Sequence, residues 1–146
     1  MCHMAELETP PLVDQLCFDL YAASRAVTSA YRPVLRELGL TYPQYLVLIV
    51  LWEQESCTVR ELADALQLDH GTLTPLLRRM EQARLVARRR NHTDERFVVV
   101  SLTEKGSALR SHANRIHCGM KDALALDEQQ ITDLQSTLRT LTARVS

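Results

Sequence analysis

The feature of this sequence that most limits its fold is a pair of helix starts placed close together, at Thr58 and Asp69. Thr58 is followed three residues later by Glu61, which is the spacing of a capping box at a helix N-terminus. The short helix that begins there reaches about Leu68. Asp69 then caps a second helix, predicted over 71–83, whose apolar side chains recur at helical spacing. Two helices joined by so tight a turn predict a helix-turn-helix.

The hydrophobic pattern changes directly after the second helix. Residues 85–87 and 97–102 predict two strands, because the run Val98-Val99-Val100 is strongly β-forming, and 88–96 predicts a polar loop between them. A β-hairpin in this place is the wing of a winged helix. We therefore expect a mainly α protein with a small β-wing, built as a winged helix-turn-helix.

Further helices are predicted on both sides of this core. Apolar residues at helical spacing begin near Leu12 and continue to about Arg32, where Pro33 favours the end of the helix. The longest apolar run, 45–52, predicts a buried helix and is far too short to cross a bilayer. The last third of the chain is predicted to be helical, with an interruption near Leu126 where Asp127 caps the final amphipathic helix.

The cysteines indicate a reducing compartment. They are scattered without the CxxC spacing of a metal or redox motif, and no signal peptide precedes them; they are Cys2, Cys17, Cys57 and Cys118. A cytoplasmic protein is expected on these grounds. No phosphate-binding loop or catalytic triad is evident, so we expect neither an enzyme nor a bound cofactor or metal.

Positive charge is concentrated in one segment. The formal net charge of the whole chain is only −1, so a nucleic-acid site would need a local excess of arginine. Seven arginines stand between Arg78 and Arg96, against Glu81, Asp94 and Glu95. A charged run is most often a solvated face. This one follows a helix-turn-helix and continues onto a hairpin, which favours DNA binding.

The helix-turn-helix geometry then predicts which side chains contact double-stranded DNA. The start of the second helix enters the major groove, which places four side chains near base edges or phosphates: Asp69, His70, Thr72 and Thr74. Later on the helix, Arg78 and Arg79 can contact bases or backbone. The wing arginines can enter an adjacent minor groove: Arg88, Arg89, Arg90 and Arg96. Asp94 is expected to pair with an arginine and hold the wing.

These residues resemble the MarR family of regulators. The resemblance lies in the string 69–81 (DHGTLTPLLRRME), in Asp94-Glu95-Arg96 and in 102–106 (LTEKG). It implies one domain over 1–146, with the winged helix-turn-helix over about 40–102 and dimerisation helices over about 10–32 and 104–146. It also implies a homodimer on a pseudo-palindromic operator. The apolar terminal segments agree with this, since both would otherwise have little to bury against.

A second set of residues is similar to the organic hydroperoxide resistance regulators within that family. The set comprises 16–26 (LCFDLYAASRA), Tyr31-Arg32-Pro33 and 39–45 (GLTYPQY). The resemblance implies that Cys17 is the thiol that peroxide oxidises. It also implies that Tyr31 and Tyr42 of the partner subunit hydrogen-bond this thiol in the reduced protein, and that Tyr21 belongs to the same site. A phenolic O–H can donate to a thiolate and stabilise it.

The resemblance further implies a repressor that releases its operator on oxidation, as part of an oxidative stress response. The resulting sulfenic acid can condense with another thiol. Cys118 is the candidate resolving thiol; a low-molecular-weight thiol is the alternative.

Three other interpretations compete with the redox sensor. The nearest is a MarR-type repressor released by a non-covalent phenolic ligand, since a free cysteine on an apolar helical face is usually packing. A thiol peroxidase would leave the helix-turn-helix and the arginines unexplained. A metal sensor would use His112, His117 and Cys118, but offsets of five and six residues do not align three ligands on one helical face.

Overall fold

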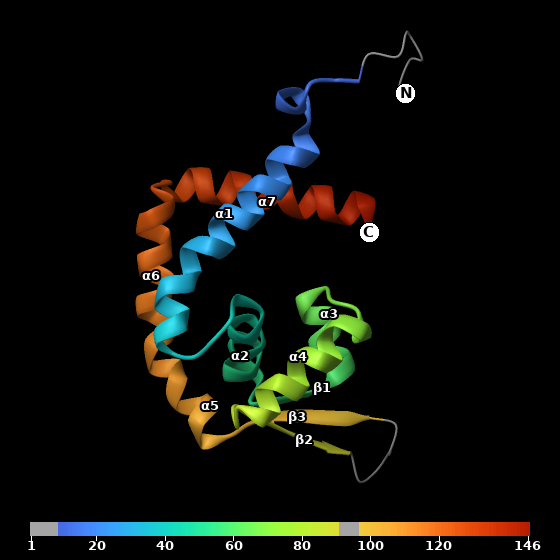
Figure 1. Cartoon of the computed structure of the whole chain (residues 1–146), viewed down its shortest axis with the longest axis vertical. Coiled ribbons are helices and arrows are strands. Elements are labelled where there is room, and N and C mark those ends of the chain that lie inside the picture. The colour runs from blue at the N-terminus through green and yellow to red at the C-terminus, as the bar shows by residue number, and fades with distance from the viewer. Residues whose placement is uncertain (1–8, 91–96) are drawn as a thin grey trace. The chain divides into compact units, whose positions relative to one another are not determined.

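A computed structural model of the chain describes residues 9–90 and 97–146. The chain forms two compact units, Met1–Tyr42 and Pro43–Ser146, which are described separately below. The described elements are mostly helical with one small antiparallel sheet, so the predicted fold class is confirmed (Figure 1).

The first unit contains a short 3-10 helix, Leu12–Asp14, and the long helix α1, Leu16–Glu37. The prediction that this helix ends before Pro33 is wrong, because α1 continues through the proline for another turn. A proline removes only one backbone N–H from the helix. The last turn is retained by Leu35, whose side chain is 1% exposed and whose carbonyl accepts from the N–H groups of Leu38 and Leu40.

The helix-turn-helix is formed by α3, Val59–Leu66, and α4, His70–Gln82, and it follows α2, Tyr42–Gln54. The predicted capping box is confirmed: Thr58 Oγ1 accepts from the N–H of Glu61 at 3.1 Å, and Glu61 accepts from the N–H of Thr58 at 2.7 Å. One side of α4 is buried in the core through Leu73, Leu76, Leu77 and Met80.

The sheet has three antiparallel strands in the order β1-β3-β2: β1 is Ser56–Thr58, β2 is Val86–Arg90 and β3 is Val98–Leu102. Two expectations need correction here. The strand β1 was not predicted, and residues 88–90 lie in β2 and not in the loop. They continue the strand because each is paired with β3, Arg88 opposite Val100 and Arg90 opposite Val98.

A cluster of hydrogen bonds joins the turn after α4 to the start of α5, Glu104–Ala108. Three successive carbonyls of the turn accept from this segment. Lys105 Nζ donates to Ala83 at 3.0 Å, Thr103 Oγ1 donates to Arg84 at 2.5 Å, and the N–H of Thr103 donates to Leu85 at 3.2 Å. Arg84 itself has φ 60°, in the left-handed region. The segment 103–106 therefore fixes the turn that ends α4.

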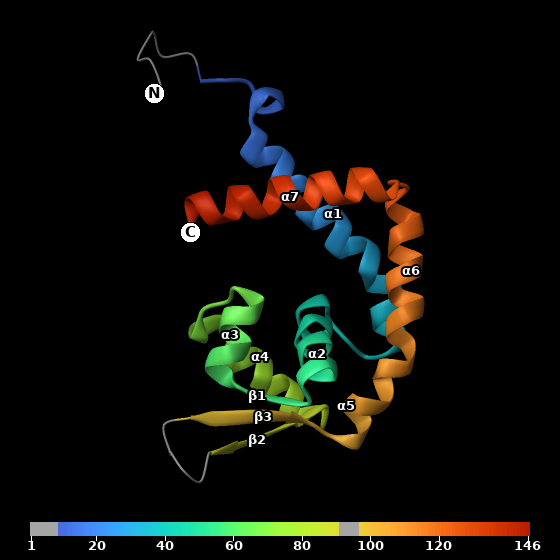
Figure 2. The same cartoon turned by 180° about the vertical axis from the view of Figure 1, so that it is seen from behind.

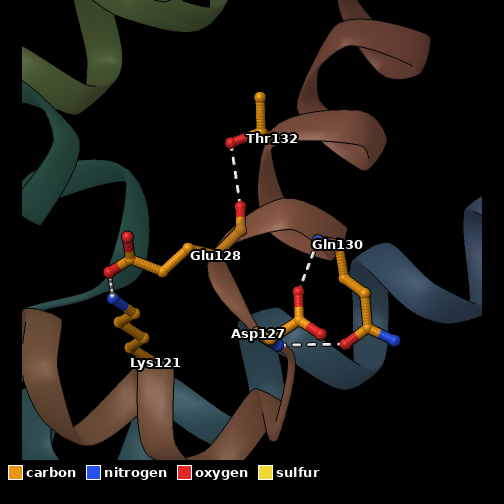
Figure 3. A network of polar contacts seen from close by, with 5 residues as sticks. All are labelled: Lys121, Asp127, Glu128, Gln130 and Thr132. Atoms are coloured by element: carbon orange, nitrogen blue, oxygen red, sulfur yellow. Dashed lines mark hydrogen bonds and ion pairs between the residues drawn. The ribbon is translucent and has the colours of Figure 1, made fainter.

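The C-terminal part of the second unit consists of a 3-10 turn, Leu109–His112, followed by α6, Ala113–Leu124, and α7, Glu128–Val145. The helix break near Leu126 is confirmed. Figure 3 shows how it is fixed: Asp127 and Gln130 form a reciprocal capping box, and Lys121 Nζ lies 2.7 Å from Glu128 Oε1 across the break. In both views α7 leaves α6 at the end far from the sheet (Figure 1 and Figure 2).

No single helix in the described residues is both long and apolar enough to span a membrane. Only α1 and α2 counted together, across the break between them, reach that length and composition.

Candidate functional site

The exposed side of α4 carries the side chains that were predicted to contact base edges or phosphates of DNA. His70, Thr74 and Arg78 follow one another at four-residue spacing, so they form one stripe along the helix. All three are exposed, as are Thr72 and Arg79. The opposite side of the same helix is buried, which fixes the direction in which this stripe points.

Asp69 is held at the start of α4 by its role as N-cap. Its carboxylate accepts from the N–H of Thr72 at 2.7 Å. This hydrogen bond is the main reason that the pKa of Asp69 is lowered from its ordinary value, and the neighbouring His70 contributes a smaller lowering. The carboxylate therefore forms the N-cap hydrogen bond that orients the helix start, which carries His70 and Thr72.

A hollow of about 360 Å³ lies between the start of α3, the exposed stripe of α4 and the base of the wing. Apolar side chains such as Leu77 and Val98 contribute to its lining, while His70, Thr74 and Arg60 contribute polar groups. Arg60 was not among the residues predicted from the sequence to contact DNA. It is exposed in the first turn of α3, directly after the Thr58 cap, and the first helix of a helix-turn-helix usually crosses the DNA backbone. That position is the signal that could have found it.

The wing arginines differ in what they contact. Arg88 is half-buried, and its Nη2 lies 2.7 Å from Oε2 of Glu81 on α4. Arg89 and Arg90 are exposed. Asp94 and Arg96, which were predicted to hold the wing and to contact DNA, lie outside the described residues.

The predicted sensor thiol is in the first unit. Cys17 is exposed in the first turn of α1. Four apolar side chains near it in the sequence are also exposed: Leu12, Val13, Leu16 and Phe18. Tyr21 lies one helical turn after Cys17 and is 61% exposed, and the guanidinium of Arg25 lies 5.4 Å from the centre of its ring. An exposed apolar surface of this kind is typical of a binding face.

The other two tyrosines of the predicted sensor site contact each other but not the thiol of their own chain. The rings of Tyr31 and Tyr42 are 4.7 Å apart between centroids and tilted by 39°. Cys17 and Tyr31 lie on the same continuous helix, and a rise of about 1.5 Å per residue separates them by about 21 Å along its axis. Within one chain, the structure therefore groups Cys17 with Tyr21 and, separately, Tyr31 with Tyr42.

The remaining cysteines have contrasting surroundings. Cys118 is exposed on α6, with its Sγ 3.7 Å from Oδ1 of Asn114. Cys57 is buried in β1, and burial, followed by the charge of Glu61, raises the pKa of its thiol. Cys2 lies outside the described residues. Within 9–90 and 97–146, no three His, Cys, Asp or Glu side chains are grouped in a way that could hold a metal ion.

The chain is similar to known transcription regulators. A family model described as the transcriptional regulator SarA/Rot matches residues 29–113. The organic hydroperoxide resistance transcriptional regulator of Bacillus subtilis (strain 168) is 47% identical over 130 residues, which cover 89% of this chain and 88% of that protein.

Solved structures of AbfR, from Staphylococcus epidermidis, are also similar. Overoxidized AbfR bound to DNA matches with a TM-score of 0.76 and 32% identity, covering 92% of this chain and 95% of that one, and reduced AbfR bound to DNA gives the same values. The disulfide-formed protein matches with a TM-score of 0.66 and 35% identity, covering 90% and 92%.

Proposed function

Because the chain belongs to the MarR-type family of winged-helix transcription regulators, and within it to the organic hydroperoxide resistance regulators, we propose that it represses transcription as a homodimer and releases its operator when an organic hydroperoxide oxidises Cys17. Like the other members of its family, the chain is a DNA-binding transcription regulator and not an enzyme. The repressor mode, the dimer and the thiol chemistry are the proposal.

The DNA-binding part of the proposal rests on α4 and the wing. The exposed stripe of α4 would enter the major groove with His70, Thr72 and Thr74 at its leading end, and Arg78 and Arg79 would follow toward bases or phosphates. Asp69 would act by holding that leading end. Arg89 and Arg90, with Arg96 beyond them in the sequence, would lie over a neighbouring groove or backbone.

The homodimer is supported by apolar side chains at both ends of the chain. The helix α7 has no buried residue, although Ile131, Leu134, Leu138 and Leu141 recur on one face. Leu134 is 49% exposed and Leu138 is 38% exposed. A second copy of the chain would cover this face together with the apolar residues around Cys17.

The observation that carries the redox proposal is the separation of the thiol from the tyrosine pair along α1. A site that combines Cys17 with Tyr31 and Tyr42 cannot form within one chain, because α1 holds Cys17 and Tyr31 about 21 Å apart and Tyr42 contacts Tyr31. In a two-fold symmetric dimer, residue i of one subunit contacts residue j of the other and the reverse. Each site would then take Cys17 and Tyr21 from one subunit and the tyrosine pair from its partner.

The chemistry follows from the thiolate. The sulfur of Cys17 bonds to the terminal oxygen of the hydroperoxide, the O–O bond breaks, and the alkoxide leaves and takes up a proton as an alcohol. The product, a sulfenic acid, condenses with a second thiol to give a disulfide and water. Loss of the tyrosine hydrogen bonds to the sulfur would let the two subunits rotate relative to each other. A small rotation is enough to move their DNA-binding helices out of alignment with the two half-sites of the operator.

The second thiol is either Cys118 or a low-molecular-weight thiol. Cys118 is exposed, as a resolving thiol must be. AbfR has been solved in a disulfide-formed state, and its overoxidized state is bound to DNA. By analogy, disulfide formation rather than addition of oxygen to sulfur would release the operator of this protein.

The test is operator binding by fluorescence anisotropy, with a labelled duplex from the region upstream of the coding sequence. One equivalent of cumene hydroperoxide should release the DNA, and dithiothreitol should restore binding. Cys17→Ser should bind the duplex as the wild type does and ignore peroxide, while Cys57→Ser is the matched control and should still respond.

Release of the Cys17→Ser variant by peroxide would overturn the sensor assignment. If the wild type bound tightly and ignored peroxide both alone and with an added low-molecular-weight thiol, Cys17 would be a packing residue, and the non-covalent phenolic ligand would become the leading hypothesis. Cys118→Ser separates the two resolving routes. If Cys118 resolves the sulfenic acid, the wild type responds to peroxide alone and the variant only with an added small thiol, whereas on the other route both proteins need the small thiol.

A further inference from the structure

The ion pair between Glu81 and Arg88 links α4, the recognition helix of the helix-turn-helix, to the wing. Both Nε and Nη2 of Arg88 donate to Oε2 of Glu81, at 3.0 and 2.7 Å. We propose that Arg88 is a positioning residue, which contacts no phosphate and instead holds the wing against α4 through Glu81. The inference rests on DNA binding by the reduced protein and not on the redox step, so it stands if the peroxide response fails.

The register of the sheet places Arg88 at the base of the wing. Arg88 is opposite Val100 of β3, and Val100 is opposite Cys57 of β1, so these three residues form one row across the sheet. Arg90 is paired with Val98, two residues closer to the hairpin tip. Side chains alternate along a strand, so Arg88 shares its face with the buried Val86 while Arg89 points to the other face.

Glu81 is difficult to explain at this position without Arg88. It lies near the C-terminus of α4, where the helix dipole disfavours a negative side chain. It is also one turn from Arg78 on the helix that would face DNA phosphates, where an uncompensated carboxylate weakens binding. Arg88 removes both problems by neutralising the charge, and the pair in turn defines where β2 lies along α4.

The geometry of the pair favours orientation over simple charge compensation. Two N–H groups of a planar guanidinium converge on one oxygen, and the side chains are only 27% exposed for Arg88 and 41% for Glu81. A lysine ammonium in place of the guanidinium would keep the charge but lose the fixed two-donor arrangement. Arg88 also lines the hollow together with His70 and Thr74. Movement of the Arg88 side chain would therefore alter the surface beside these two residues, which would enter the major groove.

The proposal predicts how affinity depends on salt. A phosphate contact releases counterions, so removing one lowers the slope of log K against log[salt] by about 0.9. A positioning residue leaves the slope unchanged while affinity falls. The matched control is Arg89→Gln, which removes the same charge from the neighbouring exposed position on the other face of β2.

The experiment uses reduced full-length protein and a labelled duplex selected from a random library by the wild type. We expect Glu81→Gln, Arg88→Gln and Arg88→Lys each to weaken binding about fivefold, the effect of a well-oriented pair at a partly exposed site. The double variant Glu81→Gln/Arg88→Gln should lose no more than either single variant, because both remove the same interaction. The salt slope should fall only for Arg89→Gln.

Four results would overturn the proposal. The first is a reduced salt slope for Arg88→Gln, the second is wild-type binding by Glu81→Gln, and the third is a loss in the double variant equal to the product of the single losses. Thermal unfolding of each variant shows whether it is folded. The fourth is wild-type binding by Arg88→Lys, because lysine keeps the positive charge that a phosphate would attract but loses the two-donor arrangement toward Glu81.

Discussion

The buried indole N–H of Trp52 donates to the carbonyl oxygen of Gly106 at 2.9 Å, which joins the end of α2 to the start of α5. Gly106 is buried at the same place, and a Cβ on this residue would overlap the carbonyl oxygen of Leu85. The segment 103–106 thus contacts α2, the turn after the recognition helix and the end of β3. Glycine is needed at 106 because the backbones approach so closely.

Gly106→Ala is expected to destabilise the protein by about 2 kcal/mol, the cost of forcing a methyl group into a packed site. Urea unfolding followed by the fluorescence of Trp52, the single tryptophan, measures it directly. Gly119→Ala is the matched control, because beyond the backbone of its own helix and its two chain neighbours nothing lies within 4 Å of the added Cβ. In the middle of α6, that change should stabilise by about 1 kcal/mol. Equal effects of the two substitutions would contradict the predicted overlap.

Substitutions of Asp69 should separate its capping role from any contact with bases. Asn can accept the same hydrogen bond from Thr72, so Asp69→Asn should keep the stability of the wild type. Asp69→Ala should lose about 1 kcal/mol of unfolding free energy and also weaken operator binding. Denaturant unfolding and anisotropy on the same variants provide the comparison. A large loss of affinity in the Asn variant would instead show that the carboxylate reads DNA.

The capping box of Thr58 and Glu61 should make the free energy of unfolding fall in acid. Hydrogen bonds from Thr58 lower the pKa of Glu61 below its ordinary value of 4.5, and Glu61 therefore stabilises the fold above that pH. This contribution is lost as the pH falls through the lowered pKa. Glu61→Gln keeps the capping box but cannot titrate. Its unfolding free energy should decline less than that of the wild type between about pH 5 and about pH 2. Parallel curves for the two proteins would refute the assignment.

The thiols should differ in their rates of alkylation. Burial and the nearby Glu61 raise the pKa of Cys57, so its thiolate is both scarce and inaccessible. Iodoacetamide should label it at least about tenfold more slowly than the exposed Cys118 in the native protein. Mass spectrometry of quenched samples follows both sites, and urea should abolish the difference. Rapid labelling of Cys57 without urea would mean that β1 opens readily.

Local signals allowed much of the fold to be predicted. Thr58 with Glu61, and Asp69, mark helix starts within three or four residues of sequence, and the structure shows these caps. The arginines of β2 were assigned to a loop because the sequence of 88–90 gives no alternation. Their strand conformation comes from pairing with β3. Similarly, the short strand β1 depends on Val99 and Val100, which are more than 40 residues away.

The site was predictable where it depends on helical spacing and not where it depends on pairing across the fold. The exposed stripe His70, Thr74 and Arg78 follows from the period of α4. The contact of Arg88 with Glu81 does not, because it needs the position of β2 against α4. The distance from Cys17 to Tyr31 does follow from the predicted helix, which contains both residues, whereas the contact of Tyr31 with Tyr42 does not.

The continuity of α1 has a consequence for how the protein would work in the cell. If the proposed sensor site needs both subunits, a continuous helix that keeps Cys17 away from its own Tyr31 would leave a lone subunit without a complete peroxide site. In the proposed dimer, sensitivity would follow the law of mass action. Dilution below the dissociation constant of the dimer would silence the sensor without altering any cysteine. The abundance of the chain would thus set its detection threshold as directly as thiol reactivity does.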